Sequence, residues 1–119
     1  MRTYDAQVVA AEEIEHVYVL VLSERRDGIG MRLEIQNGPH DDQDRSLGMD
    51  TYCLCTESGA CHYGGIKNWK FDTSDGYLYL YLDRDACEEL GVDGGLKIRI
   101  SESDAQMLID SLHRLLGSA

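Results

Sequence analysis

The chain has 119 residues, about the size of one domain that buries roughly two-thirds of its unfolded surface. Its 22 acidic and 11 basic side chains leave a formal charge of −11, which repels phosphate backbones and anionic lipid and so argues against nucleic acid and membranes as ligands. No apolar run approaches the ~18 residues of a membrane span, and the first residues lack the apolar core of a signal peptide, so we expect a cytoplasmic protein.

Strands are predicted in the first part of the chain. Residues 3–10 alternate loosely between apolar and polar side chains, and residues 14–22 form a nearly continuous β-branched run. Such a run predicts a central strand that is buried on both faces. Residues 31–35 alternate cleanly, with Arg32 and Glu34 opposite the apolar side chains, which predicts a strand with one buried face.

Turn signals separate the later strands. Strands are predicted at residues 51–56, 61–63, 68–71, 77–82 and 96–100. Ser58-Gly59 and Asp75-Gly76 are turn dipeptides that join neighbouring strands into hairpins. An antiparallel meander follows from these short connections.

The C-terminal segment predicts an amphipathic helix. Its apolar residues recur at the i, i+3, i+4, i+7 spacing that forms one stripe on a helix. The stripe consists of Ala105, Leu108, Ile109, Leu112, Leu115 and Leu116. Ser103 with Gln106 resembles a capping box at the helix start, and Gly117 ends the pattern.

A second, shorter helix is predicted before the last strand. Asp83 can cap a helix over residues 84–90, and Gly91 stands where a left-handed terminator belongs. The expected fold is therefore one α+β domain over residues 1–119. It consists of an antiparallel β-sheet meander with a short helix and a C-terminal amphipathic helix packed on the sheet.

Tyrosines alternate with leucines along the predicted strand 77–82. Tyr77, Tyr79 and Tyr81 share one face, which offers an amphipathic surface of the kind enriched in protein interfaces. The alternative is that neighbouring elements half-cover the rings. If this strand lies at a sheet edge it can pair with its own copy, which leaves a homodimer open.

The segment HDDQDRSLGMDTYCLCTESGACHYGG, residues 40–65, gathers the residues with chemical potential. Cys53, Cys55, Cys61 and His62 suggest a small metal-binding or cysteine-dependent enzyme or sensor domain as an alternative function. We expect neither, because the CxxC knuckle of a zinc site is missing and none of the cysteines begins a predicted helix that would lower its pKa. The four cysteines are expected to be thiols, although an even count also permits two disulfides.

Carboxylates precede this cysteine cluster in the same segment. Asp41, Asp42, Asp44 and Asp50 do not continue in the register of a calcium-binding EF-hand loop. The glycine pairs of the chain are not followed by the lysine and hydroxyl of a phosphate-binding loop. We therefore expect no metal and no cofactor.

Most of the chain resembles immunity protein family ten of bacterial polymorphic toxin systems. The resemblance rests on DDQDRSLGMDTYCL and ESGACHYGGI, especially on residues 48–53 and 63–65, while the flanking elements match as a pattern of strands and helices. It implies a small cytosolic α+β protein that binds and neutralises a cognate toxin and is not an enzyme.

Charge and aromatic residues agree with that implication. Strong negative charge suits rapid association with a basic toxin, and nuclease toxins carry cationic surface to hold nucleic acid. We expect aspartates to steer the encounter and tyrosines to anchor the complex. The expected partner-binding residues are Asp41, Asp42, Asp44, Asp50, Tyr52 and Tyr63.

Overall fold

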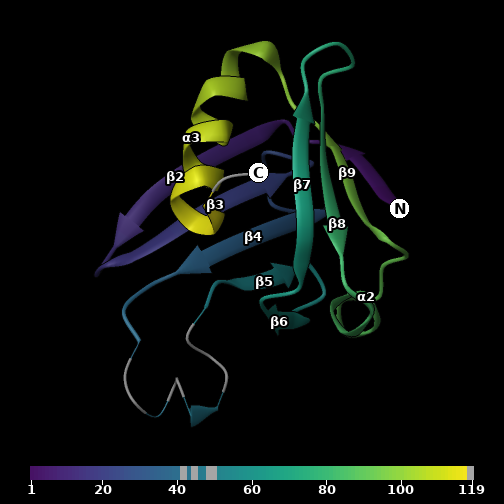
Figure 1. Ribbon diagram of the computed structural model, residues 1–119. Coiled ribbons are helices and arrows are strands. Elements are labelled where there is room, and N and C mark those ends of the chain that lie inside the picture. Colours follow the sequence, from purple (N-terminus) through teal and green to yellow (C-terminus); the bar gives the residue numbers. More distant parts are fainter. Residues whose placement is uncertain (41–42, 44–45, 48–50, 118–119) are drawn as a thin grey trace.

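Two β-sheets form the framework of the protein (Figure 1). The structure is a computed structural model that describes residues 1–40, 43, 46–47 and 51–117. One sheet has the strand order β1 (Arg2–Asp5), β9 (Gly95–Arg99), β8 (Tyr77–Leu82), β7 (Ile66–Asp72). The other has the order β2 (Val8–Ile14), β3 (Val17–Ser23), β4 (Arg32–Asn37), β5 (Cys53–Thr56), β6 (Cys61–Tyr63).

The α+β class is confirmed, with the antiparallel meander in the five-stranded sheet. The four-stranded sheet adds a feature that local patterns did not predict, because β1 pairs with β9 in parallel across almost the whole chain. The predicted strand 3–10 divides between the two sheets. The Ala6 N–H still donates to the Arg99 carbonyl, at 2.9 Å, after which the chain crosses over to start β2.

The strand predicted over residues 14–22 is corrected in both its start and its burial. It begins at Val17, because Glu15 and His16 have φ of 50° and 70° and form the two-residue turn from β2. Two positive values are the signature of a type I′ hairpin turn, whose twist matches that of the strands. The strand is an interior one, but only Leu20 and Leu22 are fully buried, while Val19 and Val21 stay partly exposed.

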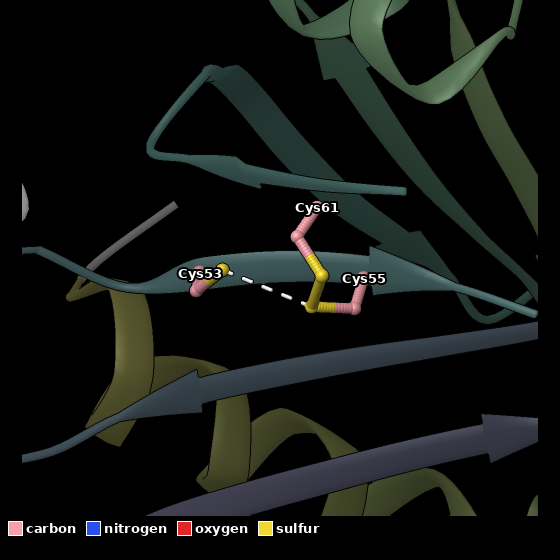
Figure 2. A group of neighbouring side chains, drawn as sticks. All are labelled: Cys53, Cys55 and Cys61. Atoms are coloured by element: carbon pink, nitrogen blue, oxygen red, sulfur yellow. Dashed lines mark hydrogen bonds between the residues drawn. A yellow bond between two sulfur atoms is a disulfide. The ribbon is translucent and has the colours of Figure 1, made fainter. Parts of the chain in front are cut away.

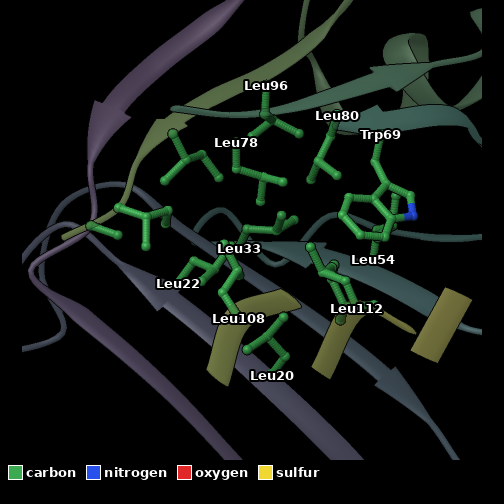
Figure 3. Packing of buried hydrophobic residues seen from close by; sticks show 14 of the residues in the cluster. Leu20, Leu22, Leu33, Leu54, Trp69, Leu78, Leu80, Leu96, Leu108 and Leu112 are labelled. Atoms are coloured by element: carbon green, nitrogen blue, oxygen red, sulfur yellow. The ribbon is translucent and has the colours of Figure 1, made fainter. Parts of the chain in front are cut away.

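The inner faces of the two sheets share one hydrophobic core (Figure 3). Leucines from both sheets are fully buried there, and Leu108 and Leu112 of the C-terminal helix pack among them. Across the core, the Tyr4 hydroxyl donates a hydrogen bond of 2.7 Å to the Leu22 carbonyl and so ties the sheets together. Burial raises the pKa of Tyr4, which keeps this donor protonated.

Two helices lie wholly within the described residues, α2 (Arg84–Leu90) and α3 (Ala105–Leu116), with a 3₁₀ turn at Glu102–Asp104 before α3. The predicted bounds and caps of α2 are confirmed: Asp83 accepts from the Ala86 N–H, and Gly91 is left-handed. The capping box at Ser103 is wrong, because that residue lies inside the 3₁₀ turn. No helix in the described part of the chain is long and apolar enough to cross a membrane.

Each helix closes a different part of the core. α3 lies against the inner side of the five-stranded sheet, where the Tyr18 hydroxyl hydrogen-bonds Ser111 at 2.9 Å. The Arg114 guanidinium covers the Tyr18 ring at 4.0 Å. α2 packs beside β6 and so close to Gly65 that no side chain fits there, because a Cβ at that position would lie 2.6 Å from the Ala86 Cβ.

Replacing His16 with glycine is expected to stabilise the protein. A left-handed backbone destabilises the folded state of a residue with a side chain by about 1–2 kcal/mol, and glycine removes this strain. Glycine also gives the unfolded chain more conformational freedom, which lowers the free energy of unfolding by about 0.4–1 kcal/mol, so the expected net gain in the free energy of unfolding is about 0.5 kcal/mol. Thermal unfolding should show a Tm rise of about 2–4 °C. Gly76→Ala is the mirror control: its φ is 77° and no clash awaits a Cβ, so its Tm should fall. An unchanged or lowered Tm for His16→Gly would contradict the I′ turn.

Candidate functional site

The site predicted from the sequence lies where β4 ends and β5 begins. Asp41, Asp42, Asp44 and Asp50 lie outside the described residues. The residues that flank this segment, His40 and Thr51, are described, and both line two hollows of the surface.

The two hollows share the segment from Asn37 to His40. One, of about 190 Å³, is lined by Val17, Gln36, Asn37, Gly38, Pro39, His40, Thr51, Cys53 and Tyr63. The other, of about 390 Å³, is lined by Glu13, His16, Tyr18, Asn37, Gly38, His40, Thr51, Arg114 and Leu115. His40 is held in place by a 2.9 Å hydrogen bond between its Nε2 and the Asn37 Oδ1. The first hollow is lined by the Tyr63 ring and the Cys53 thiol, which makes it the more suitable of the two for binding an apolar side chain.

The two tyrosines expected as anchors have different surroundings. Tyr63 is 42% exposed, lies opposite Cys53 in the β5–β6 pairing and borders the smaller hollow. Tyr52 is half-buried, and its hydroxyl accepts a 2.8 Å hydrogen bond from the Ile66 N–H at the start of β7. Burial raises the pKa of Tyr52. Tyr63 is therefore accessible from solvent, whereas Tyr52 links the two sheets.

Three cysteines lie together on the outward side of the β5–β6 hairpin (Figure 2). Cys55 and Cys61 form a disulfide, and the Cys53 sulfur lies 3.8 Å from the Cys55 sulfur. The expectation that all four cysteines are thiols is thus wrong for this pair. The reason is the hairpin register: the two residues are directly opposed, with Cα atoms 4.2 Å apart, close to the spacing of a non-hydrogen-bonded pair.

His62 does not belong to this cysteine cluster. It pairs with Leu54, whose side chain is in the core, and its Nδ1 lies 3.6 Å from a Glu89 carboxylate oxygen on α2. The four residues of the alternative metal or enzyme site therefore divide between two faces of the hairpin. Two of the three sulfurs are also committed to each other.

The remaining thiol, Cys53, is poorly prepared for nucleophilic chemistry. Burial raises its pKa, so the reactive thiolate is scarce at neutral pH. Its sulfur contacts the Leu54 carbonyl at 4.0 Å and the Cys55 sulfur, and neither can accept its proton as a general base.

The tyrosines of β8 are half-covered by cations of neighbouring strands. The Lys97 ammonium lies 4.5 Å from the centre of the Tyr77 ring, and the Lys70 ammonium lies 4.9 Å from that of Tyr79. The Tyr79 hydroxyl donates to the Asp75 carboxylate at 2.6 Å, and this hydrogen bond raises its pKa to about 12. The proposed edge pairing of this strand is wrong, because β8 lies between β9 and β7.

Comparison with known proteins gives a family match. The family model described as Immunity protein 10 matches residues 5–108, which extend from the end of β1 into α3. No curated protein and no solved structure matches the chain.

Alkylation should distinguish the bonded cysteines from the free ones. Without reductant, iodoacetamide is expected to add to two positions, Cys53 and Cys87, and after reduction in denaturant to all four. In a Cys87→Ser variant the native protein isolates Cys53, whose labelling should be slower than that of a free cysteine at pH 7 and should accelerate as pH rises. Mass spectrometry reads both results. Four additions without reductant would contradict the disulfide.

Proposed function

The chain belongs to the immunity protein 10 family, and we propose that it neutralises a cognate bacterial toxin by stoichiometric binding, without catalysing a reaction. The observation that carries this proposal is the family match over residues 5–108. The poorly activated Cys53 thiol and the separation of His62 from the cysteines give further support to a binding role. We place this activity in the cytoplasm, where one domain would act on the toxin directly.

We further propose that the toxin is basic. A chain with formal charge −11 attracts a cationic protein and repels an acidic one, so complementary charge would accelerate the encounter. A nuclease fits this description, since an enzyme that holds a phosphate backbone carries lysines and arginines on its surface.

The residues proposed for binding act at two stages. The four aspartates of the segment after β4 would steer the approach of the toxin. Tyr63, exposed beside the smaller hollow, would then slow dissociation of the complex. Tyr52 would hold the start of the hairpin to β7 through its hydrogen bond with the Ile66 N–H.

Co-expression tests the function itself. Cells that express the toxin encoded beside this gene should grow only when this chain is present, and a mixture of the chain with an inactivated toxin should form a one-to-one complex in gel filtration. Failure of both rescue and complex formation would contradict the proposal.

Neutralising the aspartates tests the steering role. The triple change Asp41→Asn, Asp42→Asn and Asp44→Asn should lower the association rate constant with the toxin about tenfold at low salt and flatten its salt dependence. The matched control removes the same charge elsewhere, through Asp5→Asn, Asp93→Asn and Glu102→Gln, all on exposed positions of the other sheet and its connections. Stopped-flow kinetics should separate the two triples; equal rates would refute the assignment.

A further inference from the structure

The outward side of the five-stranded sheet carries an unusual amount of apolar surface. We call it the aliphatic face, and its apolar members are Val8, Ala10, Ile14, Val17, Val19, Val21, Cys53, Cys55, Cys61 and Tyr63. Ile14 is 51% exposed and Tyr63 42%, Ala10 is exposed, and the others are partly exposed.

Strand register arranges the side chains of this face in rows. One row across the strands is Glu12, Val19, Gln36, Cys53 and Tyr63, and the next is Ala10, Val21, Glu34, Cys55 and Cys61. Side chains in these rows stand side by side, so apolar groups gather on β2–β3 and on β5–β6, and the polar side chains of β4, Arg32, Glu34 and Gln36, lie between the two groups.

Both helices lie on the other side of this sheet. α3 bonds to Tyr18, which alternates with the valines of β3, and α2 meets His62 and Gly65 rather than Cys61 or Tyr63. Figure 2 looks onto the aliphatic face, with α3 behind the strands. Within the described residues the valines therefore remain without a covering element.

The outward face of the four-stranded sheet offers a contrast. There the Lys70 and Lys97 ammonium groups lie over tyrosine rings, and the Tyr79 hydroxyl donates to the Asp75 carboxylate. The tyrosines of that face therefore have partners within the protein. Solvated faces of antiparallel sheets are ordinarily polar. Apolar groups exposed beside polar side chains are instead characteristic of an interaction site.

We propose that the aliphatic face is the docking surface for the basic toxin, a location that rests on the proposed function. The toxin would present apolar side chains flanked by lysine or arginine. Glu12 and Glu34 supply carboxylates within the face, and the Arg32 guanidinium on the same face lies 3.9 Å from the Glu34 carboxylate. A second copy of this chain is a poor occupant, because two molecules of charge −11 repel each other.

The smaller hollow borders this face. Val17, Cys53 and Tyr63 belong both to the face and to the lining of the hollow, which also includes His40 and Thr51. His40 and Thr51 are the described residues that flank, in the sequence, the segment whose aspartates would attract the toxin. A single projecting side chain of the toxin can be seated in about 190 Å³.

Charge placed at the centre of the face tests both the location and the partner's chemistry. Val19→Lys is suited to this because its cross-strand neighbours, Glu12 and Gln36, can accept a lysine in the folded protein. The control, Asn68→Lys, puts the same charge on an exposed position of β7 in the other sheet. Calorimetric titration with the inactivated toxin measures the Kd, and thermal unfolding verifies that each variant is folded.

Val19→Lys should raise the Kd at least about tenfold, and Asn68→Lys less than about threefold. Val19→Glu should weaken binding less than Val19→Lys, since the opposite charge meets a basic surface. If Val19→Lys does not fold, Val21→Thr, which changes only a methyl to a hydroxyl, should still raise the Kd measurably.

Several results would overturn the location. Wild-type affinity in folded Val19→Lys and Val21→Thr would do so, as would a chain that is dimeric in sedimentation and made monomeric by Val19→Lys with toxin affinity unchanged. A toxin that binds neither wild type nor variants would instead remove the proposed function, and the docking surface with it.

Discussion

The pairing of two leucine-rich sheet faces is the constraint from which the rest of this structure follows. Each sheet buries one face against the other, and α3 fills the remaining open side with Leu108 and Leu112. Burial of these apolar side chains is the main favourable term in folding. Because α2 and α3 both pack on the inner side, no helix of the described residues covers the outward face of either sheet.

The outward faces of the two sheets differ in whether their exposed side chains have partners within the protein. On the four-stranded sheet, lysines cover tyrosine rings and the Asp75 carboxylate accepts a hydrogen bond from the Tyr79 hydroxyl, so these groups have their partners within the sheet and its turns. On the five-stranded sheet, valines, a disulfide and Tyr63 remain partly exposed in an acidic protein. Apolar contact area gives a complex its lifetime and complementary charge gives it its rate of formation, so a surface that combines both suits stoichiometric neutralisation of a toxin.

Local signals in the sequence predicted local structure well, and non-local pairing poorly. The bounds of α2 and β8 follow from a capping aspartate, a terminal glycine and strict alternation, all of which act within a few residues. The parallel β1–β9 pair depends on which distant segments meet, and composition does not encode that. The Cys55–Cys61 bond depends on the exact register of the predicted hairpin, which puts these two residues directly opposite each other. The run 14–22 predicts a doubly buried strand because its apolar residues do not by themselves distinguish a buried face from an exposed one; the alternation of Leu20 and Leu22 with valines is the signal that does. The aspartates of the predicted site lie outside the described residues, and Tyr63 is the predicted anchor that the fold leaves exposed.

The most direct test of the account is methyl NMR of the valines during titration with inactivated toxin. The chain has six valines, and they report on both sides of the sheet. The methyl resonances of Val17, Val19 and Val21 should shift or broaden on complex formation. Those of Val9, buried in the core, and of Val92, beside α2, should keep their chemical shifts. Unperturbed resonances of the three β3 valines in a formed complex would contradict the claim that the exposed side of the five-stranded sheet receives the toxin.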